Sequence, residues 1–359
     1  MNRRDFARLS ALSLAASQLP RVGEAQASGK IGFAVIGLGT IARQFLEQIA
    51  NSSTVECTAL VTGHPDTKGP DWKQKFNLPN AKVYTYETMD QLRSNAAVQA
   101  VYVATPNALH LRDTLAAARA GKHVLCEKPM AISSAQCKTM IDACRAANVK
   151  LMIGYRMQYE PVYLKAREMV QNGALGKIAA IEGAFGFSAQ PGVWRLTKAL
   201  GGGGAVFDVG IYPLNAIRFL LGEEPTSYTA AMSTTDTTSG RFKEMEETTA
   251  WTMTFGNGAL AACTTSYGVS IPGMLRLHGE KGMLDFQNAY SNGRVHLTGR
   301  TTNGKVDEGT EHEENQLRLE AEAFAENIRQ NTQPRAAGEE GLRDLLAMEA
   351  IYKAAGHPL

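Results

Sequence analysis

Residues 31–42, IGFAVIGLGTIA, place a glycine-rich loop between an apolar run and the start of an amphipathic segment. Gly37 permits a tight turn out of a strand, Gly39 lets the backbone approach a pyrophosphate, and the small Ala42 allows a helix to pack closely on the strand. Glycine-rich turns also occur without a ligand, but the position after an apolar strand favours a dinucleotide. The amides at the start of such a helix donate to phosphate oxygens. The residues assigned to the cofactor here are Gly37, Leu38, Gly39, Thr40 and Ile41.

From residue 29 to about residue 154, short apolar runs alternate with helical patterns, which is typical of a parallel sheet with crossover helices. Apolar spacing near 3.6 residues predicts helices over 108–120 and 135–147. The predicted strands cover 31–36, 55–61, 82–84, 100–104, 123–126 and 150–153. The fold class is therefore α/β, and residues 29–154 are predicted to form a Rossmann NADP-binding domain.

The second part of the chain, residues 155–359, has a different pattern. Helices are predicted over 161–172, 313–330 and 341–355. The segments between them are short strands with glycine-rich turns, predicted over 178–187, 227–233, 248–255, 259–267, 275–279 and 283–286. These strands favour a C-terminal α+β domain with an open, mainly antiparallel sheet.

The composition excludes several classes of function. The 359-residue chain has a formal net charge of +2 and no run of Lys or Arg that forms a stripe, so nucleic acid is not an expected partner. The five cysteines form no C-x-x-C pair, so a disulfide framework is not expected. The sequence has no His-rich cluster and no H-E-x-x-H helix, so no metal site is expected. Small-molecule chemistry is the class that remains.

The N-terminus has the features of an export signal. Arg3 and Arg4 precede a short apolar run, residues 9–16, and an Ala-x-Ala site at residues 25–27. This order predicts a twin-arginine signal peptide over residues 1–28, whereas a solvated basic tail would not explain it. The apolar run is too short to span a bilayer, which takes roughly 20 residues. We therefore expect the Tat export machinery to carry the folded protein to the periplasm, without stable membrane insertion.

The end of the second predicted strand favours NADP over NAD. NAD-dependent folds usually place an acidic residue there, against the ribose 2′-hydroxyl. Residues 61–64 are Val-Thr-Gly-His and carry no acid. Thr62 and Gly63, with Lys68 supplying positive charge, are therefore assigned to a 2′-phosphate. The alternative is that Thr62 is only a turn residue and Lys68 a solvated one.

Further motifs extend over nearly the whole chain. They are residues 104–107 (Ala-Thr-Pro-Asn) with His110, residues 126–129 (Cys-Glu-Lys-Pro), 154–156 (Gly-Tyr-Arg), 193–195 (Val-Trp-Arg) and 201–215 (GGGGAVFDVGIYPLN). Together with residues 37–42 they resemble the glucose-fructose oxidoreductase-like group of the Gfo/Idh/MocA family. The resemblance implies a Rossmann domain, a second domain for substrate and oligomerisation on an open antiparallel sheet, and a nicotinamide cofactor between them. It also implies a homo-dimer or homo-tetramer formed through the sheet face.

The resemblance assigns catalysis to Lys128 and Tyr212. Many relatives carry His as the base where this chain has Tyr212, and tyrosine there resembles the branch that includes glucose-fructose oxidoreductase and aldose-aldose oxidoreductase. A phenol with an ordinary pKa of about 10 is a poor base at neutral pH. The ammonium group of Lys128 and an oxidised nicotinamide ring would favour the phenolate. Lys128 follows an apolar run, residues 124–126, which indicates the carboxyl edge of the sheet rather than a surface lysine.

Other matching positions are assigned to ligands in the same way, each with a structural alternative. Asp208 could bind sugar hydroxyls or cap the helix that follows it. Arg156 and Arg195 could anchor a ligand or act as ion-pair partners, and Trp194 could stack on a ligand or pack in the core. His110 could lie near the nicotinamide or satisfy backbone groups. The assigned cofactor residues in these motifs are Thr105, Asn107, His110, Glu127, Lys128, Trp194 and Arg195, and the substrate residues are Lys128, Arg156, Asp208 and Tyr212.

The primary hypothesis is an exported sugar oxidoreductase with tightly bound NADP(H). It would oxidise an aldose at C1 to a lactone and reduce a second sugar, with Tyr212 as acid and base in a ping-pong hydride transfer. One alternative is a conventional NAD(P)-dependent sugar or polyol dehydrogenase that uses free cofactor. A further alternative, from another class, is an exported protein that binds a sugar or nucleotide without turnover.

Overall fold

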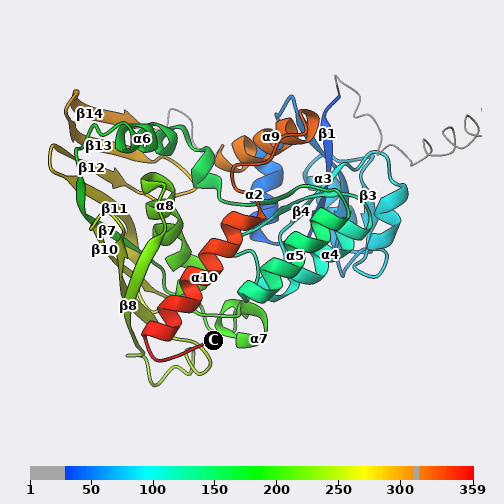
Figure 1. Cartoon of the computed structure of the whole chain (residues 1–359). Coiled ribbons are helices and arrows are strands. Elements are labelled where there is room, and N and C mark those ends of the chain that lie inside the picture. The colour runs from blue at the N-terminus through cyan, green and yellow to red at the C-terminus, as the bar shows by residue number, and fades with distance from the viewer. Residues whose placement is uncertain (1–28, 310–314) are drawn as a thin grey trace, which may run out of the picture.

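The computed structural model describes residues 29–309 and 315–359. The predicted signal peptide, residues 1–28, lies outside the described residues, as do the first two residues of the helix predicted over 313–330. The chain forms two sheets side by side (Figure 1). We call the part of the chain around the first sheet the first half (residues 29–154) and the part around the second sheet the second half (residues 155–359). Helix α10 (Gly338–Ala354) runs between the two sheets. It contacts α5 (Ser134–Ala146) of the first half and β8 (Pro225–Ser233) of the second sheet.

The first sheet has six parallel strands in the order β3-β2-β1-β4-β5-β6. They are β1 (Ile31–Ile36), β2 (Val55–Val61), β3 (Lys82–Tyr84), β4 (Ala100–Val103), β5 (His123–Cys126) and β6 (Leu151–Ile153). Each predicted strand is confirmed to within one residue at either end. The order is that of a Rossmann sheet, and it reverses between β1 and β4, where such sheets open a ligand crevice at their carboxyl ends.

The helices of this half mostly follow the apolar spacing of the sequence. Helix α2 (Thr40–Ile49) buries Ala42, Phe45, Leu46 and Ile49, which form one face of a helix. Helix α4 (His110–Arg119) lies within the predicted segment 108–120, and α5 is shifted by one residue from the predicted 135–147. The sequence pattern does not predict α3 (Lys68–Lys75), because this polar helix buries Gly69 and no larger side chain.

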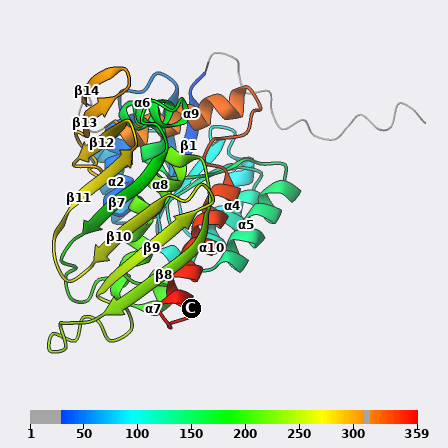
Figure 2. The ribbon, with the colours of Figure 1, turned by 60° about the vertical axis from the view of Figure 1, so that its left-hand side comes forward.

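The second sheet has eight strands in the order β14-β13-β12-β11-β7-β10-β9-β8. The strands not yet given are β7 (Ile178–Gly186), β9 (Thr248–Phe255), β10 (Leu260–Ser266), β11 (Ile271–Gly279), β12 (Gly282–Gln287), β13 (His296–Thr301) and β14 (Gly304–Gly309). Neighbours are antiparallel except β7 and β10, which are parallel. The predicted open, mainly antiparallel sheet is therefore confirmed, and no helix of the described residues covers one of its broad faces (Figure 2).

Two features of this sheet differ from the sequence-based expectation. The parallel pair arises because β8 follows β7 only after a helical connection and joins the far edge, which leaves β10 beside β7. The hairpin of β13 and β14 was not expected. It buries Leu297 and Val306 in an otherwise polar segment, so its apolar alternation is weak.

Besides α10 and the short α7 (Lys198–Gly201), three longer helices follow residue 155 in the described part of the chain. Helix α6 (Pro161–Gln171) agrees with its prediction, and α9 (Gln316–Arg329) returns to the first half, where it packs on α2. Helix α8 (Ile211–Leu221) follows a π-helical turn, Val206–Gly210, and lies on β7, where a Cβ at Gly183 would be 2.9 Å from Pro213 Cβ. The helical stretch 198–221 is long and apolar enough to cross a membrane, but 89% of its apolar window is buried, as in a core helix.

Arg218 ties α8 to α10 inside the protein. Its side chain is 1% exposed, and the guanidinium pairs with Asp344, with Glu340 at 3.1 Å and with Glu224 at 2.7 Å. Burial raises the pKa of Asp344 to about 6, although Arg218 acts in the opposite direction. The two helices are therefore joined by a buried cation between carboxylates.

The Arg218→Met variant is expected to lose about 3–5 kcal/mol of the free energy of unfolding at pH 7, because it leaves Asp344 buried without its counter-charge and Glu340 with Arg343 alone. Urea unfolding followed by circular dichroism measures this loss. Arg145→Met is the matched control, since Arg145 forms an exposed pair with Asp142 at 3.1 Å and should cost less than about 1 kcal/mol. Equal losses in the two variants would contradict the structural role of Arg218.

Candidate active site

A cleft of about 690 Å³ lies at the carboxyl ends of β1, β4 and β5 and is lined from both halves of the chain. Its size and position are typical of a ligand site in an open parallel sheet. Thr62 and Gly63 do not line it. The predicted site residues that do are Gly37, Leu38, Gly39, Thr40, Ile41, Lys68, Thr105, Asn107, His110, Glu127, Lys128, Arg156, Trp194, Arg195, Asp208 and Tyr212.

The glycine loop fits a dinucleotide pyrophosphate. Gly37 leaves β1 with a φ of +87°, and a Cβ there would lie 2.8 Å from Thr105 Cγ2. A Cβ at Gly39, the residue before α2, would have no atom within 4 Å, so the approach to the first amides of the helix is open. The first turn of α2 carries no acidic side chain. An open helix N-terminus of this kind suits a phosphate group.

The structure separates the residues that were assigned to the 2′-phosphate. Thr62 is 3% exposed, and its hydroxyl accepts a hydrogen bond from the backbone N–H of His64 at 3.1 Å, which corresponds to the turn alternative. Lys68 lines the cleft and donates to the Leu38 carbonyl at 3.2 Å. Lys68 is therefore the member of this group that brings positive charge to the glycine loop.

Lys128 reaches from the first half of the chain to the second. Its amine donates to the backbone carbonyl of Asp208 at 2.7 Å and to the carboxylate at 3.1 Å, and it lies 4.4 Å from the ring centroid of Tyr212. Burial acts to lower the pKa of Lys128, but Tyr212, Asp208 and Glu127 outweigh burial and raise it above its ordinary value. The structure thus brings the two predicted catalytic side chains together, with the lysine as a cation.

Asp208 is the anion at the centre of this network. One carboxylate oxygen faces Lys128, and the other accepts from Arg195 Nε at 2.9 Å and from the Tyr267 hydroxyl at 2.8 Å. Burial acts to raise the pKa of Asp208, but Lys128, Arg195 and the Tyr267 hydrogen bond hold it well below its ordinary value. The capping alternative is wrong, because α8 follows Gly210 with no side-chain cap.

The ring of Tyr212 lies between cations and aromatic rings. Lys128 is on one side at 4.4 Å, and the guanidinium carbon of Arg156 lies 5.2 Å from the same centroid. The rings of Phe185 and Tyr290 have centroids at 5.6 and 5.9 Å. Two cations and two aromatic rings therefore surround the phenol ring.

His110 contacts backbone carbonyl groups. It is 1% exposed, and its ring nitrogens lie 2.8 Å from the Thr105 carbonyl oxygen and 2.9 Å from that of Pro129, which follows a cis peptide bond. Burial lowers the pKa of His110. The contacts of His110 are therefore those of the structural alternative, in which the imidazole satisfies backbone groups. His110 joins the turn after β4 to the Lys128-Pro129 segment.

Two further cleft residues also hold the protein in shape. Asn107 donates to the Gly201 carbonyl at 3.0 Å, which links the turn after β4 to the glycine stretch 201–204. Glu127 accepts from the Tyr102 hydroxyl at 2.5 Å and from the Lys128 backbone N–H at 3.2 Å. The Glu127 bonds therefore orient the backbone at Lys128, and the Asn107 bond holds the glycine stretch beside the cleft.

The two arginines of the assigned set have protein partners. Arg195 pairs with Asp208 at 2.9 Å and lies 4.5 Å from the Trp194 ring centroid, while 39% of its side chain stays exposed. Arg156 is 5% exposed and donates to two backbone carbonyls of the loop between β12 and β13 at 2.8 and 2.9 Å. The ion-pair alternative thus describes Arg195, and Arg156 anchors a loop.

Some cleft residues escape the sequence-based assignment. Gln44 stands one helical turn after Thr40 on α2, so its spacing from the glycine loop could have marked it from the sequence. The others come mainly from β7 and from the loop between β12 and β13, where no local motif marks them. The set is Gln44, Tyr86, Phe185, Phe187, Tyr290, Ser291 and Asn292.

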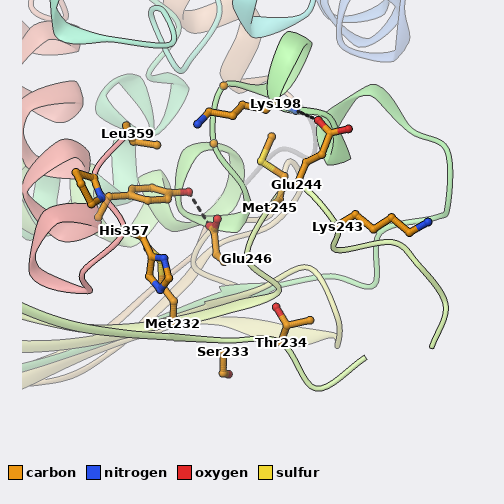
Figure 3. A pocket seen from close by; sticks show the side chains of 14 residues that line it. Lys198, Met232, Ser233, Thr234, Lys243, Glu244, Met245, Glu246, His357 and Leu359 are labelled. Carbon is orange, nitrogen blue, oxygen red and sulfur yellow. Dashed lines mark hydrogen bonds between the residues drawn. The ribbon is translucent and has the colours of Figure 1, made fainter. Parts of the chain in front are cut away.

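A second cavity of about 520 Å³ lies beside residues 202 and 203 (Figure 3). Glu246 accepts from the Tyr352 hydroxyl at 2.8 Å, and this hydroxyl accepts from the Gly204 backbone N–H at 2.9 Å. Burial raises the pKa of Glu246. The lining includes both Lys198 and Glu244, so its charges are mixed. The hydrogen bonds of Tyr352 hold the glycine stretch 201–204 in place, and the mixed charges of the lining do not favour one class of ligand.

Comparison with known proteins agrees with the fold and the cleft. Residues 31–155 match the oxidoreductase family with an NAD-binding Rossmann fold, and residues 163–285 match the GFO/IDH/MocA C-terminal domain. The chain belongs to the Gfo/Idh/MocA family. The predicted family, the predicted oxidoreductase and the predicted fold class are thereby confirmed.

Relatives of this Gfo/Idh/MocA oxidoreductase include sugar enzymes. D-xylose 1-dehydrogenase (NADP(+)) of Haloarcula marismortui is 30% identical over 90% of this chain and 91% of that protein. 1,5-anhydro-D-fructose reductase of Ensifer adhaerens is 28% identical over 89% of this chain and 95% of that protein. The crystal structure of aldose-aldose oxidoreductase from Caulobacter crescentus complexed with glycerol superposes with a TM-score of 0.86 at 39% identity, over 91% of this chain and 98% of that one.

Proposed function

We propose that the protein is an exported sugar oxidoreductase that keeps NADP(H) tightly bound, oxidises an aldose at C1 to a lactone and passes the hydride to a second sugar. The observation that carries the proposal is the Lys128 amine, 4.4 Å from the Tyr212 ring centroid, at the carboxyl edge of the Rossmann sheet. The 39% identity to an aldose-aldose oxidoreductase supports the same chemistry.

The cofactor would lie along the cleft, with its pyrophosphate at the glycine loop. Gly37, Gly39 and the first amides of α2 would hold the phosphates, and Lys68 supplies the positive charge that favours NADP. The nicotinamide ring, when bound, supplies the acceptor and donor of hydride. The oxidoreductase domain match and the NADP(+) specificity in the name of the xylose dehydrogenase support this choice.

Tyr212 would move the proton. As the phenolate, its oxygen would accept the proton from the C1 hydroxyl of the first sugar while hydride leaves the same carbon, and the carbonyl product is a lactone. Lys128 and Arg156 would stabilise the phenolate, and Asp208 would hold Lys128 against the ring. In the second half of the cycle Tyr212 would return the proton to the carbonyl oxygen of another sugar as that carbon receives hydride.

Export and cofactor retention support one another. The twin-arginine start indicates export in the folded state, and the periplasm has no soluble pool of NADP, so a nucleotide carried there must stay bound and be reset by a second substrate.

We also propose a homo-dimer or homo-tetramer through the uncovered face of the second sheet (Figure 2). Leu260 on β10 is 55% exposed and adds apolar surface to this sheet, which a partner subunit would cover.

The test is to purify the protein without added nucleotide and to assay released NADP(H) after denaturation. Turnover between two sugars is then measured without free cofactor. We expect nearly one nucleotide per chain and conversion of one sugar to a lactone as the other is reduced. An empty protein that works only with added nucleotide would contradict the proposal.

The second candidate is a conventional sugar or polyol dehydrogenase that uses free NAD(P). The 30% identity to D-xylose 1-dehydrogenase over 90% of this chain favours it. The site would perform the same proton transfer, so the two candidates differ in whether the nucleotide leaves after each turnover. The nucleotide assay of the purified protein therefore separates them.

A further inference from the structure

Helix α2 is held by the second half of the chain at two positions one turn apart. Gln44 Oε1 accepts a hydrogen bond from Asn292 Nδ2 at 3.1 Å. Gln48 Oε1 accepts from the backbone N–H of Leu317 at 2.9 Å, at the start of α9. Residues four apart lie on the same helix face. The helix whose N-terminus faces the cleft is thus gripped along one side by two separate segments.

Arg156 joins these two segments to each other. Its guanidinium donates to the Ser291 carbonyl at 2.9 Å and to the Tyr290 carbonyl at 2.8 Å, in the loop between β12 and β13. It also donates to the side chain of Gln316, the first residue of α9. A continuous path of contacts therefore leaves α2 at Gln44 and returns to it one turn later.

Most of this path is firmly anchored. The Ala289 carbonyl accepts from the Tyr163 hydroxyl at 2.6 Å, and the Tyr290 hydroxyl donates to the Met274 carbonyl at 3.1 Å. Ala289 and Tyr290 are buried, whereas Asn292 and Gln44 are only half-buried. The amide pair at the tip of the loop is thus the link that opens with least disruption.

The same pair lies on the dinucleotide cleft. Gln44, Ser291 and Asn292 line it together with Thr40 and Ile41 of the phosphate-binding turn. A nucleotide seated there is enclosed on one side by α2 and on the other by the loop tip. Separation of the amide pair would widen the cleft where the two halves of the chain meet.

We propose that the hydrogen bond between Asn292 and Gln44 is a clasp that closes the loop between β12 and β13 over the bound dinucleotide and slows its release. The inference rests on the proposed function, for which it supplies a means of retention. The clasp is a neutral amide pair, so it opens without separating charges. Arg156 keeps the rest of the loop beside the Tyr212 ring while the tip opens.

The test loads purified protein with NADPH, adds excess NADP(+), and follows the loss of protein-bound NADPH fluorescence. Gln44→Ala and Asn292→Ala are each expected to release NADPH about five- to tenfold faster, the effect of one lost neutral hydrogen bond. The double variant is expected to match the single variants, because both remove the same bond. Asn303→Ala, in the turn of the neighbouring β13–β14 hairpin, is the matched control and should release NADPH at the unmodified rate.

Three results would overturn the clasp. They are release at the unmodified rate in both single variants, a double variant whose effect is the product of the two single effects, and an equal acceleration in Asn303→Ala. The second would mean that each residue contacts the nucleotide independently. An unmodified protein that is empty on purification would contradict the proposed retention, whereas the rates of the loaded variants would still decide the clasp.

Discussion

Tyr212→Phe is expected to lower kcat for sugar oxidation by about 10³-fold, because the variant has no phenolic oxygen to take the proton from the sugar. The phenylalanine ring keeps its place between Phe185 and Tyr290, whose centroids lie 5.6 and 5.9 Å away. We therefore expect unchanged nucleotide content and an unchanged unfolding midpoint. Lactone formation under saturating sugar and the nucleotide content of the purified variant measure the two effects.

Tyr228→Phe on β8 is the matched control for this experiment. Tyr228 is half-buried in the second sheet and does not line the cleft, so its loss of a hydroxyl should leave kcat nearly unchanged. A Tyr212→Phe variant with the activity of the unmodified protein would contradict the assignment of Tyr212 as acid and base. Unchanged behaviour in every assay would favour a protein that binds without turnover.

Lys128→Met is expected to lower kcat by about 10²–10³-fold, the usual effect of removing one charge that stabilises a transition state. The variant removes the cation 4.4 Å from the Tyr212 ring centroid. It also removes both hydrogen bonds to Asp208, at 2.7 and 3.1 Å, and leaves that carboxylate with Arg195 and Tyr267. Steady-state kinetics with saturating sugar measure the loss.

The difference in the free energy of unfolding between Lys128→Met and the unmodified protein should depend on pH. Burial acts to raise the pKa of Asp208, but Lys128, Arg195 and Tyr267 hold it well below the ordinary 3.8, so the ionised carboxylate stabilises the fold above that value. This contribution is lost as the pH falls. The part that Lys128 supplies should therefore separate the two proteins in urea unfolding at pH 7, and the difference should shrink progressively below about pH 5.

Lys165→Met is the control for both effects. Lys165 forms an exposed ion pair with Glu308 and does not line the cleft, so its loss should change neither kcat nor the pH dependence by much. Equal loss of activity in Lys165→Met and Lys128→Met would contradict the role of Lys128. A difference in stability that grows as the pH falls would contradict the role given to Asp208.

Strands and glycine turns could be predicted because their causes are local. A run such as residues 31–36, buried along its whole length, identifies a central strand of a parallel sheet from its own side chains. Gly37 and Gly39 identify the turn because neither has a Cβ, and the small Ala42 identifies the helix face that packs on the strand. Lys128 and Tyr212 could be assigned because each stands in a motif. The polar hairpin of β13 and β14 has no comparable local pattern.

Pairing and contact depend on the folded chain. Asp208 meets Lys128, Arg195 and Tyr267, which stand 80, 13 and 59 residues away in sequence, and no spacing rule joins them. The Thr62 hydroxyl accepts a hydrogen bond from the backbone N–H of His64 in the turn after β2, and composition alone could not decide between this contact and a ligand.

The amino-acid pattern alone was sufficient for the Rossmann sheet and for most of the second sheet, because periodicity and turn chemistry act over a few residues. The oxidoreductase family and the assignment of Lys128 and Tyr212 came instead from the resemblance of whole motifs to those of the family. Tertiary packing decided the parallel pairing of β7 with β10, the contacts of Asp208 with Lys128, Arg195 and Tyr267, and the contact of Asn292 with Gln44, 248 residues apart. Such contacts depend on how whole elements pack, and many different sequences satisfy the same local rules without making them.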